Sequence, residues 1–390
     1  MLDESRRGFD EMRRLNRWAL QSAARELMPG QRVASCLRLR GFDPETRKCY
    51  PDVWVMYAEE MKRAHYKHLL VCGSVWMCPL CAAKISERRR VELAQAIENS
   101  DFFFALVSET LQHSYEDKLK DSLEALLHAR QKLKAGRAWQ DFIRDFEIVG
   151  TISSLETTYG VNGHHPHDHT LLVARRPLDA GAVHGFIFPR WLAALSECDR
   201  SASSDRGIDV RTAQSDVALY VAKWGHEPKN PKRPFGWTIE HELTKSVSKM
   251  SRGDKGLTPL DLLQAFLGGD QRAGALWQDY ARTFKGRHQL QWSRGLRELL
   301  GLGKIERDQE IAERADQPAT LLARLSLYQW QVVLGNDARG ELLDVASSGK
   351  IEDLEKFLRE IGAGEQPRGA PVRDTKLREF ARRVCAEGEI

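Results

Sequence analysis

The spacing of apolar residues changes several times along this 390-residue chain, and each change predicts a different element. The apolar run FFFALV over 102–107 predicts a buried strand, and leucines at helical spacing follow it from Leu119 onward. Residues 147–158 predict another strand, which glycine and asparagine turn chemistry connects to a return strand over 164–173 (HHPHDHTLLV). These two strands predict a β-hairpin.

Helical patterns account for much of the remaining chain. Helices are predicted within 1–30, around 183–197 and over 216–224 (DVALYVAKW), where Ser215 and Gly225 suit the two caps. A short strand is expected at 208–211, and beyond residue 260 the pattern is entirely helical. It ends with an apolar helix face in 351–362, a Gly/Pro-rich linker and a charged terminal helix.

These elements predict an α+β protein with a central antiparallel sheet, flanking helices, a cysteine-containing N-terminal module and a helical C-terminal region. The expected parts are an N-terminal helix (1–35), the cysteine-containing module (36–95), the sheet domain (96–260) and the helical region (261–390). With 42% hydrophobic residues, a chain of this length can fill more than one core.

Charge and hydropathy argue against a membrane protein and bear on whether the partner is a nucleic acid. No apolar run is long enough to cross a bilayer, and the N-terminus is charged from its third residue, so we expect a cytoplasmic protein with no membrane partner. The net charge of +4 does not by itself indicate a nucleic-acid partner. Lys and Arg concentrate in KISERRR (84–90), in KNPKRP from Lys229 and in 284–297, where Trp292 is interleaved. Each segment could follow a phosphate backbone or could simply be a solvated helix face.

Three of the seven cysteines, Cys72, Cys78 and Cys81, fall within ten residues. In a chain without a secretory signal this spacing favours metal binding over disulfides. A structural zinc site needs a fourth ligand. The candidates are Cys36, Cys49, His65 and His68.

Alternating histidines on the return strand indicate a second metal site. Residues two apart on a strand share a face, so His167 and His169 lie together. With the turn centred near Asn162 and Gly163, Glu156 falls opposite His169. Two imidazoles and one carboxylate, with open positions for phosphate oxygens, suit Mg²⁺ or Mn²⁺. The alternatives are a merely His-rich surface strand and a metallo-hydrolase H-x-H-x-D-H motif, which lacks one residue here.

Tyr220 lies on the helix predicted over 216–224. Asp216 at i−4 and Lys223 at i+3 share its face. A phenol can attack phosphorus when a metal and a nearby cation favour the phenolate, and the carboxylate could activate water in a later step. Packing is the more common role for a tyrosine on a helix.

Together these motifs resemble the rolling-circle plasmid replication initiators of the HUH endonuclease superfamily, in the single-tyrosine group. The resemblance covers roughly residues 36–300, with the motifs in the family's order. They are CGSVWMCPLCAAKISERR, FALVSETLQHS, GRAW, SSLETTYGVNGHHPHDHTLLV, DVALYVAKWG and KGRHQLQWSRGL. The resemblance implies that His167 and His169 bind the divalent ion, that Tyr220 attacks the DNA phosphate with Lys223 as its companion, and that Asp216 activates water for termination.

The implied activity is nicking of one strand at a plasmid origin through a 5′-phosphotyrosine link, followed by strand transfer. Its partners would be double- and single-stranded origin DNA, a host helicase and a DNA polymerase. The family tends to carry an upstream cysteine, which favours Cys36 as the fourth zinc ligand, with Cys49 next.

Three positions depart from the family pattern. Asp168 replaces an apolar residue between the two histidines, so it would face the other side of the strand and need a partner if buried. Asp216 is one methylene shorter than the usual Glu, and His164 replaces an aromatic residue.

Two other classes of protein remain. A relaxase or single-strand transposase belongs to the same superfamily, but a relaxase usually places its tyrosine before the histidines, and here it follows them by about fifty residues. A non-catalytic, zinc-dependent DNA-binding protein would bind without cutting.

Overall fold

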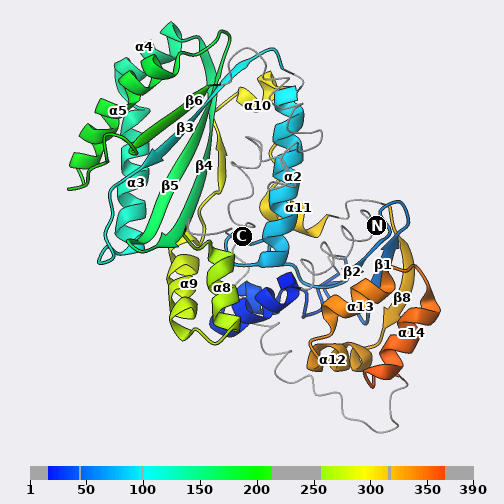
Figure 1. The fold of residues 1–390 in the computed structure, drawn as a ribbon. Coiled ribbons are helices and arrows are strands. Elements are labelled where there is room, and N and C mark those ends of the chain that lie inside the picture. The colour runs from blue at the N-terminus through cyan, green and yellow to red at the C-terminus, as the bar shows by residue number, and fades with distance from the viewer. Residues whose placement is uncertain (1–15, 44, 99, 213–255, 315–317, 365–390) are drawn as a thin grey trace, which may run out of the picture. The chain divides into compact units, whose positions relative to one another are not determined.

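The computed structural model describes residues 16–43, 45–98, 100–212, 256–314 and 318–364. The chain forms two compact units (Figure 1). The central unit is Val75–Ile311, and the split unit combines Met1–Ser74 with Ala312–Ile390. The four-part division expected from the sequence stays a prediction. The helix predicted over 216–224 and the charged terminal helix lie outside the described residues.

A five-stranded antiparallel sheet organises the central unit, with strand order β6-β3-β5-β4-β7. Its strands are β3 (Phe103–Thr110), β4 (Ile148–Gly160), β5 (Gly163–Ala174), β6 (Ile208–Thr212) and β7 (Leu290–Trp292). The long hairpin β4–β5 lies at its centre, flanked by β3 and β7. This arrangement confirms the predicted α+β fold with a central antiparallel sheet.

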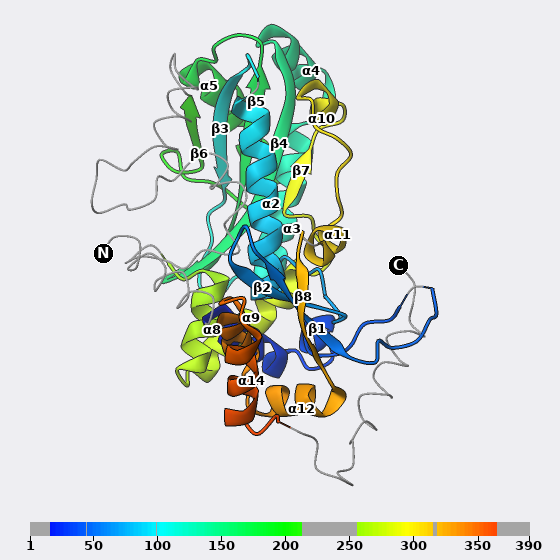
Figure 2. The same ribbon diagram turned by 90° about the vertical axis from the view of Figure 1, so that its right-hand side faces the viewer.

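Helices cover both faces of this sheet. One face, called here the α3 face, packs against α3 (Leu119–Leu133), α4 (Gly136–Asp145) and α5 (Ala180–Ser196) (Figure 1). The opposite face, called the α2 face, packs against α2 (Pro79–Glu98) and α10 (Leu296–Leu299) (Figure 2). The α2-face core joins Leu93 of α2 to Leu171 and Val173 of β5. Because side chains alternate along a strand, this contact assigns a face to every residue of β5.

The hairpin turns earlier than the sequence analysis expected. Gly160 pairs with Gly163, so Glu156 lies opposite His167 and the predicted pairing with His169 is wrong. The reason is local, since Gly163 takes the left-handed backbone (φ +88°) as the first residue of β5 instead of lying within the turn. The register differs by two residues, and an even shift keeps Glu156 on the same face as the histidines.

The expectation of a purely helical chain beyond residue 260 is also wrong. Two strands occur there, β7 and β8 (Thr320–Leu325), and each pairs with a strand far away in sequence. The helices of this region are α8 (Pro259–Leu267), α9 (Gln271–Phe284), α11 (Asp308–Glu313), α12 (Leu327–Gly335), α13 (Arg339–Ala346) and α14 (Ile351–Glu360). β7 has only three residues, and Leu325 is the one buried residue of β8, so the local pattern of either strand carries little signal without its partner.

The split unit contains a second sheet, with strand order β2-β1-β8. Its other strands are β1 (Val53–Ala58) and β2 (Arg63–Lys67), and the short 3-10 helix η1 (Arg32–Ser35) precedes them. Arg339 of α13 is buried beneath this sheet, where it donates to Gln21 Oε1 at 2.9 Å and lies over the Trp18 ring. Tyr66 Oη donates to the backbone oxygen of Arg339 at 2.8 Å. A buried cation therefore joins the helical residues 16–27 to α13.

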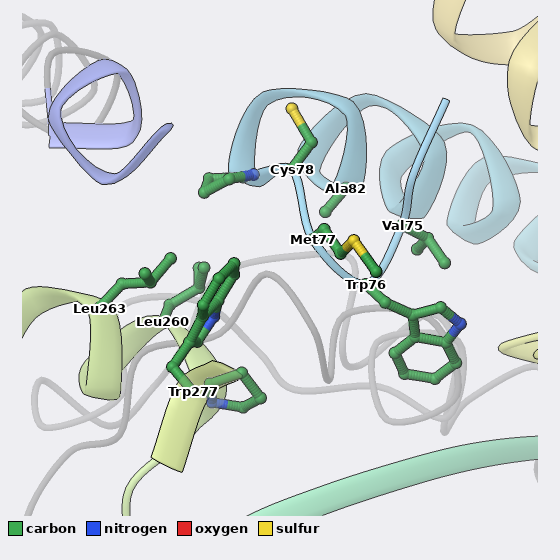
Figure 3. Close-up of a pocket in the computed structure, with 10 residues that line it drawn as sticks. Val75, Trp76, Met77, Cys78, Ala82, Leu260, Leu263 and Trp277 are labelled. Atoms are coloured by element: carbon green, nitrogen blue, oxygen red, sulfur yellow. The ribbon is translucent and has the colours of Figure 1, made fainter. Parts of the chain in front are cut away.

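The start of α2 packs against α8 and α9 through apolar side chains. Met77, Leu260 and Trp277 line a small hollow there, and the Trp76 indole points away from Leu260 and Trp277, as Figure 3 shows. Trp76 Nε1 also donates to the backbone oxygen of Arg287 at 2.6 Å. The lining of this small hollow is almost wholly apolar, so we interpret it as core packing. None of the helices within the described ranges is long and apolar enough to cross a membrane.

Candidate functional site

Four cysteines come together around the start of α2. The Sγ atoms of Cys36, Cys72, Cys78 and Cys81 all lie within 4.8 Å of one another, and all four residues are buried. Cys36 follows η1 directly, and its sulfur accepts a hydrogen bond from the Cys72 backbone N–H at 3.3 Å. Cys78 directly precedes α2 and Cys81 lies in its first turn, so the two cysteines, three residues apart, lie on one side of the helix start. A buried set of four thiol donors fits a structural zinc ion.

The other candidates for a fourth ligand lie outside this group. Cys49 is exposed. The His68 ring stacks on Tyr50, with ring centroids 3.8 Å apart, and its Nδ1 lies 3.6 Å from Asp52 Oδ1. His65 is a residue of β2. The structure thus brings Cys36, the preferred candidate, to the other three cysteines.

Glu156, His167 and His169 form a second group, on the α2 face of the hairpin. Their ligand atoms all lie within 4.8 Å of one another. His167 Nε2 is 3.3 Å from Glu156 Oε2, and His169 Nε2 is 3.8 Å from Glu156 Oε1. The sequence predicted these three residues together, and the structure places them together.

Hydrogen bonds at the opposite ring nitrogens orient both imidazoles. His167 Nδ1 lies 3.1 Å from the backbone oxygen of His165. Because a carbonyl oxygen can only accept, Nδ1 carries a proton, which leaves Nε2, the ring nitrogen that faces Glu156, as the atom that can bind a metal ion. His169 Nδ1 bonds the Ser108 hydroxyl of β3 at 2.9 Å. Such bonds fix the tautomer and ring direction of metal-binding histidines, so this donor set fits a divalent ion with open positions for oxygen ligands.

Asp168, between the two histidines, faces the α3 side and is fully buried. Arg130 of α3 supplies the partner that the sequence analysis required, with Nη1 3.0 Å from Asp168 Oδ1. A second Arg130 nitrogen donates to Gln291 Oε1 at 3.0 Å, which ties α3 to β7. The ion pair therefore holds the strand segment that carries His167 and His169.

Two more titratable residues complete this buried cluster. Glu109 of β3 pairs directly across from Asp168, and burial followed by the nearby Asp168 carboxylate raises the pKa of Glu109 to about 8. Lys134 Nζ donates to Ser153 Oγ at 2.7 Å, and burial lowers the pKa of Lys134. Sequence reasoning missed Arg130, Lys134 and Glu109. The available signal was the spacing of Arg130 and Lys134, which are four residues apart and so share one side of the helix end.

The remaining hairpin histidines are neutral near pH 7. Burial, followed by repulsion from His167 and then His113, lowers the pKa of His165 to about 3. Burial and His113 lower the pKa of His164 to about 4. The His165 ring stacks on His113, with centroids 4.6 Å apart and planes 9° apart. The sequence analysis gave no role to His113.

The basic segments differ in their surroundings. In 84–90, Arg89 is buried and lies 3.5 Å from both Glu92 and Asp308, so this run is tied up in ion pairs. In 284–297, Arg297 pairs with Glu92 at 2.5 Å whereas Arg294 is exposed. The KNPKRP segment lies outside the described residues, as do Tyr220, Asp216 and Lys223.

Fold and site define a class of protein in which a central antiparallel hairpin presents two histidines and a glutamate, and in which four cysteines form a separate group. The chain is 28% identical over 312 residues to Protein rep of Streptomyces lividans, a match that covers 62% of this chain and 66% of that protein. It is 29% identical over 152 residues to a Neomycin resistance protein of Streptomyces cyanogenus, covering 32% and 35%.

These matches bear out the resemblance to plasmid replication initiators. The chain spans slightly less than two thirds of the length of the first relative, at 66%, and about a third of the second. No family model matches the chain, and no solved structure matches it.

Proposed function

We propose that this protein initiates plasmid replication by cutting one DNA strand at the origin in a metal-dependent reaction. The observation that carries the proposal is the convergence of His167 Nε2, His169 Nε2 and the Glu156 carboxylate on two central strands. The similarity to Protein rep supports a role in plasmid replication. The partners would be double- and single-stranded origin DNA, a host helicase and a host DNA polymerase.

Glu156, His167 and His169 would hold a magnesium or manganese ion, which withdraws electron density from the oxygens of the scissile phosphate. Tyr220 Oη would form a bond to phosphorus as the bond from phosphorus to the 3′ oxygen breaks. The phenol gives up its proton and the departing 3′ oxygen gains one, so a 5′-phosphotyrosine and a free 3′-hydroxyl result. One phosphodiester replaces another, and the step needs no ATP.

The residues around Tyr220 would assist each stage. Lys223 would stabilise the phenolate by its charge, because an opposite charge nearby favours the ionised form. Asp216 would take a proton from the water that opens the regenerated site after a round of copying. The four cysteines Cys36, Cys72, Cys78 and Cys81 would hold a structural zinc ion.

The test is a nicking assay with supercoiled plasmid bearing the cognate origin and Mn²⁺. We expect open-circular DNA with covalently attached protein from the wild type and none from Tyr220→Phe. His167→Ala and His169→Ala should lose both nicking and the bound-Mn²⁺ signal in electron paramagnetic resonance, whereas His184→Ala, on α5 away from the group, should keep both. Nicking by Tyr220→Phe at the wild-type rate would refute the mechanism.

A second candidate function is zinc-dependent DNA binding without cleavage, which the buried four-cysteine group favours. It predicts that metal chelation abolishes origin binding while supercoiled plasmid stays intact. A relaxase or single-strand transposase would also form a phosphotyrosine, but would act on transfer or transposon ends in place of a replication origin. The same nicking assay with origin, transfer-site and transposon-end DNA distinguishes the initiator, the relaxase or transposase, and the non-cleaving DNA-binding protein.

A further inference from the structure

A cluster of two tyrosines and an arginine lies at the turn end of the β4–β5 hairpin, and we call it the hairpin-end cluster. It consists of Tyr115 from the loop after β3, Tyr159 of β4 and Arg272 of α9. Arg272 Nη2 donates to Tyr115 Oη at 2.5 Å and to Tyr159 Oη at 3.2 Å. The guanidinium carbon also lies 5.5 Å from the centre of the Tyr115 ring. The two phenol oxygens therefore fix the direction of this cation.

The cluster exposes both an aromatic face and a positive charge. Tyr115 is 59% exposed and Arg272 is exposed. Within the described ranges no carboxylate forms an ion pair with Arg272, so its charge is not compensated there. Holding the long, exposed Tyr115 and Arg272 side chains in one conformation costs conformational entropy, and hydrogen bonds exposed to water offset that cost only weakly. A ligand that binds both side chains would add the missing stabilisation. A ring and a cation held in this way are prepared for a ligand that carries planar groups and negative charge.

The backbone beneath the cluster is held firmly. Asp117 accepts hydrogen bonds from the Ser114 backbone N–H and from Arg200 Nη1, both at 2.6 Å, which fixes the loop that carries Tyr115. A Cβ at Gly163 would lie only 3.2 Å from the Tyr115 Cα, so this loop packs directly on the hairpin. Tyr115 therefore moves with the strands that carry the metal-binding group.

The cluster is close to the Glu156, His167 and His169 group. Tyr159 is three residues beyond Glu156 on β4, about 10 Å along the strand, and its side chain projects from the opposite face at the end of the hairpin. Between them, the His113 and His165 rings stack, and His165 adjoins His167 with centroids 5.1 Å apart. A DNA strand that bends around the end of the hairpin could contact the metal-binding group on one face and the hairpin-end cluster on the other.

We propose that the hairpin-end cluster binds single-stranded DNA beside the scissile phosphate. Tyr115 stacks on a base, and Arg272 contacts a backbone phosphate. Base stacking on an exposed aromatic ring and phosphate contact by arginine are the interactions that bind single strands without reading their sequence. This inference rests on the proposed function, since it places the strand to be cut across the metal-binding group.

The test measures binding of a short dye-labelled oligothymidylate by fluorescence anisotropy, with the full chain and without added divalent metal. We expect Tyr115→Ala to raise the Kd by about 5- to 150-fold, the range for loss of one stacked base. Tyr115→Phe keeps the ring and loses only the hydroxyl that Arg272 bonds, so it should raise the Kd less than Tyr115→Ala does. Arg272→Gln should weaken binding and reduce the slope of log K against log salt by about 0.7, the value for one phosphate contact. Arg137→Gln, an exposed arginine on α4, is the matched control.

A cross-link between an iodouridine-substituted oligonucleotide and Tyr115 would support the assignment directly. Unchanged oligonucleotide affinity in both Tyr115→Ala and Arg272→Gln would overturn it, as would losses in Arg137→Gln equal to those in Arg272→Gln. Because this measurement involves no cleavage, such a result would leave Tyr220-dependent nicking standing. Failure of nicking with normal oligonucleotide binding would instead count against the proposed function alone.

Discussion

The ion pair between Arg130 and Asp168 offers the sharpest test of how this fold holds its histidines. Asp168 is 0% exposed, and the Arg130 side chain is 14% exposed. Arg130→Met removes one partner and leaves a buried carboxylate without its nearest cation. Breaking a buried pair in this way costs about 3–5 kcal/mol of the free energy of unfolding. The nearby Lys134 can compensate in part, so we expect a loss of about 3 kcal/mol, at the low end of that range.

Removing both charges should cost much less. Asp168→Leu restores an apolar residue of the kind usual at this position in the resembling family, and with Arg130→Met it exchanges the ion pair for apolar packing. Such exchanges are often neutral, and removing the Asp168 carboxylate also takes away one of the groups that raise the pKa of Glu109. We therefore expect the double variant to lie within about 1 kcal/mol of the wild type in denaturant unfolding. A double variant as unstable as the sum of its two single variants would refute the reasoning.

Three further predictions concern titration, zinc and salt. Because the pKa of Glu109 is raised to about 8, the folded state keeps the Glu109 proton between about pH 4.5 and 8, whereas the unfolded state has released it. The free energy of unfolding therefore falls as pH rises through this window. Glu109→Gln should remove that fall, and its stability relative to wild type should grow from pH 6 to 9; a constant difference in thermal unfolding would contradict the assignment. Cys36→Ser should lose the bound zinc while Cys49→Ser keeps about one ion per chain, as measured by mass spectrometry of the folded protein; equal zinc content in both would exclude Cys36 as a ligand. Arg294→Gln should reduce the salt dependence of duplex origin binding by about 0.9 in slope if 284–297 contacts phosphate, and an unchanged slope would remove that segment from the interface.

Local sequence patterns were sufficient to predict the strands whose apolar and turn residues lie within one short segment. The apolar run of β3 and the turn chemistry between β4 and β5 predicted the central strands. The period of two placed His167 and His169 on one face, and it also required a partner for Asp168 on the other. The register of the hairpin was wrong by two residues, because the position of one left-handed glycine decides where the chain reverses.

By itself, the sequence determined the α+β class, the hairpin and the residue types of both candidate metal sites, because these depend on periodicity and ligand chemistry within short segments. Only the tertiary structure decided that Arg130 neutralises Asp168, that β8 pairs with β1, and that Arg272 rests between Tyr115 and Tyr159. Each of these contacts joins positions between 38 and 272 residues apart. Contacts at such separation depend on how whole elements pack, and no local pattern encodes them.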